Sequence, residues 1–174
     1  MTGTTEDRRR RHRFERLVGA LRQDMYRYAF WLSRDPALAE DVVQEAMMRA
    51  WRSLDRLRDE GAARQWLLTI VRRENARHFE RKRLDTVDVD DLTRKDEGLL
   101  ADSHDTDVDD MRAALLELPD DYREPLVLQV LLGYTTEEIA GVMDLKQATV
   151  LTRLHRARNR LKEHFAAEGL TADE

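Results

Sequence analysis

Apolar residues recur at helical spacing through most of the chain, and this pattern predicts an all-α protein. From about residue 14 to residue 32 they follow the i, i+3, i+4, i+7 positions of one helix face. A second helix is expected from Pro36 to about Leu57, because Asp35 suits the N-cap and proline suits the first helical position. Gly61 interrupts the pattern, and a third helix is expected from about residue 62 to residue 83.

The helical pattern is lost between residues 84 and 110. This segment is acidic and has no sustained apolar period, apart from a short helical turn that the sequence allows around Leu99 and Leu100. On composition alone, the segment is typical of a solvated tether.

The helical pattern then returns in the C-terminal part. A short helix is expected from residue 111 to residue 118, and another runs from Asp120 to just before Gly133 and carries Leu126, Val127, Val130 and Leu131. These segments predict two small helical domains joined by an acidic flexible linker. The expected parts are a basic N-terminal tail (1–13), a first domain (14–83), the linker (84–110) and a second domain (111–168).

The stretch TTEEIAGVMDLKQATVLTRLHRARNRLK, residues 135–162, has the spacing of a helix-turn-helix. Thr135 and Glu138 can form a capping box. Small Ala140, the turn residue Asp144 and apolar Val150 stand where the two helices of this motif meet. Asp144 replaces the usual glycine, and Asp tolerates a left-handed backbone better than most residues. Spacing alone leaves two interpretations open, a DNA-binding motif and an ordinary helical hairpin.

The second helix of this stretch carries basic residues without any acid, which favours DNA binding over a solvated basic helix. Gln147, Thr149 and Thr152 lie in its first turns, where side chains of a recognition helix reach base edges. Its lysines and arginines suit phosphates. They are Lys146, Arg153, Arg156, Arg158, Arg160 and Lys162.

Charge is strongly segregated along the chain. The net charge of the 174 residues is −5, yet residues 1–83 hold 20 Lys/Arg and 13 Asp/Glu, whereas residues 84–110 hold 2 and 11. Local charge therefore says more about partners than the acidic total does.

Several classes of protein are excluded or disfavoured. The chain has no cysteine, which excludes disulfides and thiolate metal sites. No stretch of 18 residues is apolar, so we expect no membrane span and a cytoplasmic protein. The five histidines lack metal-ligand spacing, and neither a Gly-rich phosphate loop nor HExxH occurs, so no enzyme, metal or cofactor is expected.

Two segments together resemble one family. The first segment resembles the second domain of bacterial sigma factors of the extracytoplasmic-function group. It consists of DPALAEDVVQEAMMRAWRSLDRL and ARQWLLTIVRRENARHFERKR. LPDDYREPLVLQVLLGYTTEEIAGVMDLKQATVLTRLHRARNRLKE resembles their fourth domain. The resemblance covers about residues 14–83 and 111–165, in the family's order. It implies a factor that binds core RNA polymerase, directs it to promoters with −10 and −35 elements, and assists melting.

The resemblance assigns the exposed face of the second helix to the polymerase. In the family this face docks on the clamp coiled coil of the largest subunit, and the fourth domain meets the flap. The matching residues of the second helix are Asp41, Gln44, Glu45 and Arg49. They lie off the apolar face, so we expect them to be exposed.

By the same resemblance, the third helix opens and reads the −10 element, with a base flipped from the non-template strand. Arg73 and Arg77 stand where the family usually has Asn and Asp, so the −10 sequence stays open. Trp66 is interpreted as core. His78 and Phe79 are candidates for contact with a base, although Phe79 suits burial equally well. The residues assigned to −10 DNA are Arg72, Arg73, Asn75, Arg77, His78 and Arg81.

The helix from about residue 147 would read the −35 element. Leu151 and Ala148 depart from the usual basic residue and glycine, so no −35 sequence is expected from the chain alone. Thr152, His155 and Arg156 occupy reading positions, and Arg153 and Arg158 suit phosphates. The assigned residues are Gln147, Thr149, Thr152, Arg153, His155, Arg156 and Arg158.

Other interpretations accompany this one. The acidic linker would suit the positively charged path toward the polymerase active site as a mimic of RNA. The Arg-rich start RRRRHR is interpreted as a solvated tail rather than a phosphate contact. An anti-sigma protein is an expected partner. The alternatives are a stand-alone helix-turn-helix regulator, usually dimeric, and an adaptor that binds polymerase without reading promoters.

Overall fold

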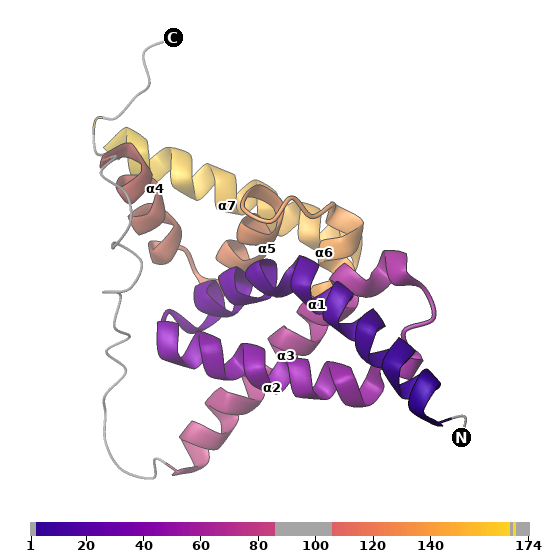
Figure 1. Cartoon of the computed structure of the whole chain (residues 1–174). Coiled ribbons are helices and arrows are strands. Elements are labelled where there is room, and N and C mark those ends of the chain that lie inside the picture. The colour runs from indigo at the N-terminus through magenta and orange to yellow at the C-terminus, as the bar shows by residue number, and fades with distance from the viewer. Residues whose placement is uncertain (1–2, 86–105, 168, 170–174) are drawn as a thin grey trace. The chain divides into compact units, whose positions relative to one another are not determined.

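The computed structural model describes residues 3–85, 106–167 and 169, and the regular elements in this part of the chain are all helical (Figure 1). The chain divides into two compact units, residues 1–94 and 95–174. The prediction of an all-α protein with two helical domains is confirmed. Most of the expected linker, including the turn around Leu99 and Leu100, lies outside the described residues.

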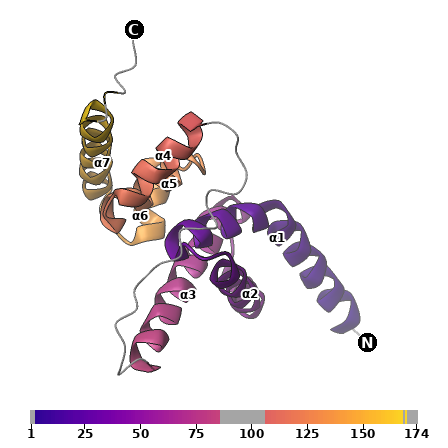
Figure 2. The ribbon, with the colours of Figure 1, turned by 90° about the vertical axis from the view of Figure 1, so that its left-hand side faces the viewer.

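The N-terminal unit packs three long helices against one another (Figures 1 and 2). Met25 and Tyr28 of α1, Val43 of α2, and Leu67 and Val71 of α3 are fully buried and form the centre of its core. Both views show the C-terminal end of α3 extending beyond the other two helices. The elements are α1 (Gly3–Ser33), α2 (Pro36–Ser53), the 3₁₀ turns η1 (Leu54–Arg56) and η2 (Glu60–Ala62), and α3 (Ala63–Asp85).

Helix α2 starts as its sequence predicts and ends four residues early. The Asp35 carboxylate accepts the N–H groups of Ala37 at 2.9 Å and Leu38 at 3.2 Å, and Pro36 occupies the first turn. The helix ends at Ser53 rather than near Leu57, since a 3₁₀ turn follows that buries Leu54.

Helix α1 begins at Gly3, so the structure differs from the expected basic tail. Arg10 donates to the Trp51 carbonyl at 2.8 Å, and its guanidinium lies 4.5 Å from the centre of the Trp51 ring. Arg13 donates to the Leu57 carbonyl at 2.6 Å. The N-terminal turns of α1 therefore pack on the last turn of α2 and on the segment that joins α2 to α3.

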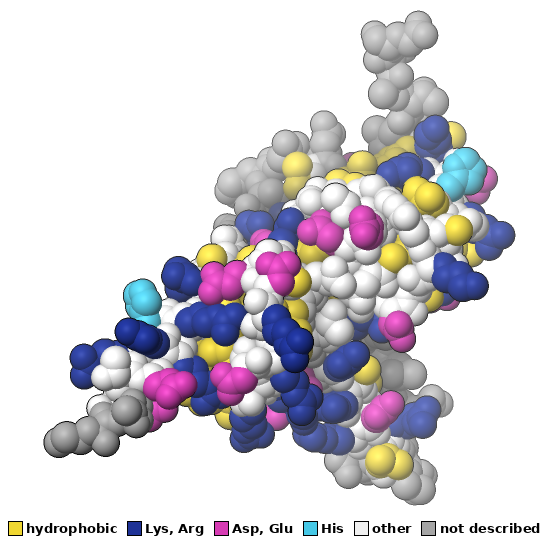
Figure 3. Space-filling model, turned by 90° about the vertical axis from the view of Figure 1, so that its right-hand side faces the viewer, with side chains coloured by type: hydrophobic (Ala, Val, Ile, Leu, Met, Phe, Trp, Pro, Cys, Tyr) yellow, Lys and Arg dark blue, Asp and Glu magenta, His cyan; other side chains and the backbone are white. Residues whose placement is uncertain are grey.

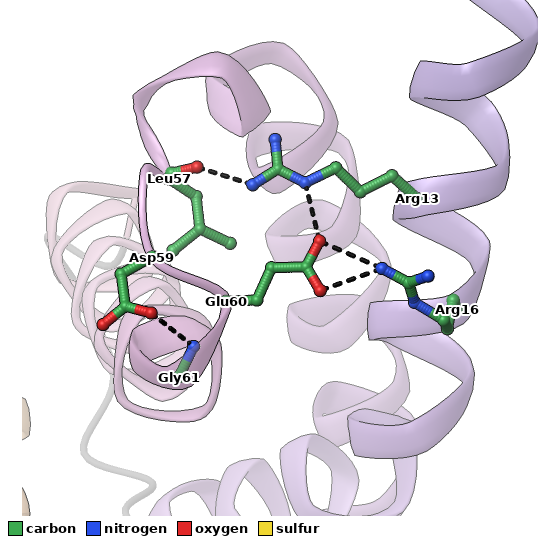
Figure 4. A network of polar contacts seen from close by, with 6 residues as sticks. All are labelled: Arg13, Arg16, Leu57, Asp59, Glu60 and Gly61. Carbon is green, nitrogen blue, oxygen red and sulfur yellow. Dashed lines mark hydrogen bonds and ion pairs between the residues drawn. The ribbon is translucent and has the colours of Figure 1, made fainter.

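A polar network fixes this joining segment (Figure 4). The Glu60 carboxylate accepts from Arg13 at 3.2 Å and from Arg16 at 2.8 and 3.0 Å. Asp59 accepts the Gly61 N–H at 2.8 Å and so caps η2. We call the contacts of Arg10, Arg13 and Arg16 with residues 51–60 the α1 latch.

Within residues 106–167, the C-terminal unit consists of four helices whose core contains Leu128, Ile139, Val150 and Leu154. Buried Arg123 supports the α4–α5 turn, since it donates to the carbonyls of Leu116 and Leu118 at 3.1 Å each and pairs with Asp120. The elements are α4 (Thr106–Glu117), α5 (Asp120–Val130), α6 (Thr136–Met143) and α7 (Gln147–Ala167).

Two expectations for this unit are wrong. Helix α4 starts at Thr106, so residues 106–110 belong to a helix and not to the linker. Leu126 and Val127 are buried as expected, but Val130 and Leu131 are 64% and 42% exposed, because α5 ends at Val130 and the chain turns away toward Gly133, which has a φ of 68°.

Replacing Arg13 with alanine is expected to destabilise the N-terminal unit by about 1 kcal/mol, because the Leu57 carbonyl and Glu60 lose a charged donor. In a domain of this size that lowers the unfolding midpoint by about 4–8 °C, measurable by calorimetry. Arg11→Ala is the matched control, since Arg11 is exposed in the same part of α1. Equal shifts for the two variants would contradict the α1 latch.

Candidate nucleic-acid interface

The helix-turn-helix geometry is built by two local devices that the sequence predicts. Thr135 Oγ1 accepts the Glu138 N–H at 3.2 Å, and the Glu138 carboxylate accepts the Thr135 N–H at 2.8 Å, which completes the capping box at the start of α6. Asp144 has a φ of 54° and a ψ of 50°, the left-handed conformation. Val150 is fully buried against α6, as expected.

Helix α7 presents most of its predicted reading side chains at the surface. Gln147, Thr152, His155 and Arg156 are exposed, and Thr149 is half-buried. Gln147 donates to Thr136 Oγ1 at 2.8 Å, which joins the starts of α6 and α7. A shallow hollow of about 390 Å³ lies between these first turns and the start of α5. It is bordered by Asp121, Tyr122, Ala148, Thr149, Thr152, Arg153 and Arg156.

The arginines of α7 that were assigned to phosphates are held by α5. Arg153 forms an ion pair with Asp121 at 3.0 Å, and Arg158 donates to the Gln129 side chain. The guanidinium of Arg160 lies 4.9 Å from the centre of the Tyr122 ring. These contacts orient the basic side of α7, and no sequence pattern signals them because they join distant segments.

On α2, the four residues assigned to the polymerase share one side of the helix. Asp41 and Gln44 are exposed, whereas Glu45 and Arg49 are half-buried. Met48 follows Gln44 by one turn and is 48% exposed, an unusual position for a long apolar side chain. Sequence reasoning missed Met48, although the neighbouring polar residues at i−4 and i−3 place it on the same face.

Helix α3 divides its assigned residues between surface and interior. Arg73, Arg77 and Arg81 are exposed, and Arg72 and His78 are half-buried. Asn75 is only 8% exposed, and its Oδ1 has no hydrogen-bond partner among the described residues. Asn75 is buried because position 75 follows buried Val71 by one turn, and its assignment to −10 DNA stays a prediction.

Two aromatic residues of α3, Trp66 and Phe79, lie at the margin of the first domain's core. Trp66 and Phe79 are half-buried, and the His78 and Phe79 rings meet edge to face with centres 6.3 Å apart. Neither ring of that pair is sealed in the core, so both interpretations given for Phe79 stay open.

Glu74 is a buried acid among the described residues of this domain, with a side chain only 4% exposed. Its Oε1 lies 2.5 Å from Arg49 Nε and 2.7 Å from Arg77 Nη1. One carboxylate therefore connects a residue assigned to the polymerase with a residue assigned to DNA.

None of the helices in 3–85 and 106–167 is long and apolar enough to cross a membrane. The same parts of the chain hold no group of three or more His, Asp or Glu side chains suited to a metal ion.

Comparison with known proteins identifies the family. Residues 17–84 match Sigma-70 region 2, and residues 109–161 match Sigma-70, region 4. The chain is 31% identical over 162 residues to the ECF RNA polymerase sigma factor SigC of Mycobacterium tuberculosis, covering 90% of this chain and 85% of that protein. It is 28% identical over 161 residues to SigX of Bacillus subtilis, covering 87% and 83%.

Solved structures agree with these matches. The sigma factor RpoE, solved in complex with the anti-sigma factor NepR from Bartonella quintana, has a TM-score of 0.70 at 29% identity, covering 86% of this chain and 94% of that one. The chain therefore belongs to the sigma-70 family, in its extracytoplasmic-function group. It is an alternative sigma factor that directs RNA polymerase, and the stand-alone regulator is not favoured.

Substitution of Asp144 tests the turn of the helix-turn-helix. Valine is expected to lower the free energy of unfolding by about 1–2 kcal/mol, because a β-branched residue is strained at positive φ. Glycine should leave the protein at least as stable, since it adopts this conformation without strain. Urea unfolding of the wild type and the two variants measures the order of their unfolding free energies. A valine variant as stable as wild type would refute the left-handed turn.

Proposed function

We propose that the chain binds core RNA polymerase through α2. It recognises the −10 element through α3 and the −35 element through α7. The observation that carries this proposal is a capped helix-turn-helix with a basic second helix in the same chain as a Sigma-70 region 2 match. The factor acts in transcription initiation in the cytoplasm and has no catalytic role of its own.

The face of α2 formed by Asp41, Gln44, Glu45 and Met48 docks on the clamp coiled coil of the largest subunit. Its two carboxylates suit a basic partner surface, and exposed Met48, one turn beyond Gln44, supplies an apolar anchor beside them. Arg49 extends this face while it stays paired with Glu74.

The exposed arginines of α3 hold the −10 region. Arg73, Arg77 and Arg81 recur every four residues, so they form one charged row along the helix. Such a row follows a nucleic-acid backbone, and half-buried His78 can stack on a base of the melted strand.

Helix α7 enters the major groove at the −35 element, while its domain also contacts the polymerase flap. The first turns of α7 place Gln147, Thr152, His155 and Arg156 at the surface, where they can contact base edges and backbone. Held by Asp121, Arg153 is presented to a phosphate without a large loss of side-chain entropy.

An anti-sigma protein is a further proposed partner. The related RpoE was solved with the anti-sigma factor NepR. The α2 helix has exposed carboxylates and α7 has exposed arginines, so an anti-sigma protein could bind two surfaces of opposite charge. Covering these two surfaces would block docking on polymerase and on DNA.

Run-off transcription from a randomised promoter library, with core RNA polymerase and with or without the protein, tests the proposed function. We expect transcripts that depend on the protein and share two spaced upstream motifs. Polymerase binding without promoter selection would instead indicate an adaptor. Tight duplex binding by the protein alone, without dependent transcripts, would indicate a stand-alone regulator.

Met48→Ala is expected to weaken binding to core polymerase about fivefold, corresponding to about 1 kcal/mol of lost apolar burial. Leu84→Ala is the matched control, because Leu84 is 74% exposed and lies at the far end of α3. Fluorescence anisotropy with labelled protein measures both affinities. Identical affinities for the two variants would show that Met48 is not part of the docking face.

A further inference from the structure

Leu151 is a large apolar side chain on the outward side of α7, where it is 53% exposed. The buried side of this helix is formed by Val150, Leu154 and Ala157, so Leu151 adds little to the core. Figure 3 shows single apolar side chains scattered among charged ones over one face of the molecule, so exposure alone assigns no role. The role of Leu151 follows from what its neighbours on α7 present.

Ala148 and Thr152 extend the apolar surface at Leu151. Ala148 is exposed and lies three residues before Leu151 and four before Thr152, so it adjoins both side chains on the helix surface. The Thr152 hydroxyl donates to the Ala148 carbonyl at 3.0 Å. Its proton is thereby used within the helix, and the γ-methyl group remains for a partner. We call Ala148, Leu151 and Thr152 the methyl patch.

Two polar neighbours of the methyl patch are bonded within the domain. Gln147 donates from its side-chain amide to Thr136 Oγ1 at 2.8 Å, and Arg153 forms an ion pair with Asp121 at 3.0 Å. Part of the donor capacity of Gln147 and Arg153 is therefore directed toward α6 and α5. The first turns of α7 consequently offer a partner more apolar surface than their polar sequence suggests.

The chemistry of the DNA major groove identifies what the methyl patch can meet. The base edges there present hydrogen-bond donors and acceptors, and thymine adds an apolar C5-methyl group. An apolar side chain set against a donor or acceptor would leave that group unpaired. The methyl patch lies at the start of α7, the part of a recognition helix that reaches base edges. Thymine is therefore the base that this surface suits.

We propose that the methyl patch contacts the C5-methyl group of a thymine in the −35 element, with Leu151 as a specificity-determining residue. The chain then selects a thymine at that position without a hydrogen bond to the base. A basic side chain at position 151 would instead suit a phosphate. The proposal rests on the proposed function, in which α7 reads the −35 element, and it names one base that α7 selects.

The test uses holoenzyme assembled from core polymerase and the full chain, on a promoter selected from the randomised library. Each thymine of the −35 element, on either strand, is replaced in turn by deoxyuridine, which lacks only the C5-methyl group. Equilibrium binding to a labelled promoter fragment gives the affinities. At one thymine the wild-type affinity is expected to fall about three- to fourfold, the effect of leaving one methyl group unburied. Deoxyuridine outside the promoter elements is the DNA control.

Leu151→Ala is expected to bring the ratio of thymine to deoxyuridine affinities at that position close to one, because the methyl group then stays in water. Val130→Ala is the matched control and should keep the wild-type ratio, since Val130 is 64% exposed in the same unit but lies on α5. The ratio compares two DNA fragments with the same protein, so an altered affinity for polymerase does not change it.

Two substitutions of Thr152 separate a contact by its methyl group from one by its hydroxyl. Thr152→Val keeps methyl groups and removes the hydroxyl, so it should give a ratio near that of wild type. Thr152→Ser keeps the hydroxyl and removes the methyl group, so it should lower the ratio. A higher ratio for valine than for serine supports the methyl patch, and any other order overturns it.

The remaining outcomes are equally decisive. Equal wild-type affinities for thymine and deoxyuridine throughout the −35 element overturn the proposal, as does a selected −35 element without thymine. A Leu151→Ala variant with the wild-type ratio also overturns it. In these cases the wild type still initiates from the selected promoter, so the proposed function stands. Absence of promoter-dependent transcription by the wild type would instead overturn the proposed function, and this proposal with it.

Discussion

Burial of one side of α3 against α1 and α2 determines which of its residues are available to a partner. Leu67 and Val71 lie on the buried side, and Glu74 and Asn75 take the next positions of the same stripe. Arg73, Arg77 and Arg81 consequently face outward. A buried carboxylate requires compensation, and Arg49 and Arg77 supply it. The charged row on α3 and its connection to α2 both follow from this helical period.

Local signals in the sequence predicted local structure well. Three features show this: the Asp35 cap, the capping box of Thr135 and Glu138, and the left-handed Asp144. Each involves residues within four positions of one another, so one short stretch of sequence contains every residue that forms the feature. The alternation of apolar and polar residues was likewise enough to predict helices and two domains.

Predictions that depended on distant partners were less successful. The sequence predicts a solvated tail at the basic start of the chain, whereas in the structure this start contacts the Trp51 ring and the Leu57 carbonyl. Asn75 is predicted to be a surface donor because it is polar, although its position in the sequence belongs to the buried side of α3. Arginines therefore fall into two groups that composition does not separate. Some, such as Arg13 and Arg123, hold the fold, and others face outward for partners.

The α1 latch also bears on where this domain physically begins. The match to Sigma-70 region 2 starts at residue 17, yet Arg10, Arg13 and Arg16 lie before that boundary. A chain shortened to the matched region would uncover one face of the Trp51 indole and leave the Trp51 and Leu57 carbonyls to be solvated by water. The segment between α2 and α3 would then be held mainly by buried Leu54 and Leu57. Sequence similarity thus marks the shared part of the domain, whereas the packed part of α1 extends about two helical turns further toward the N-terminus.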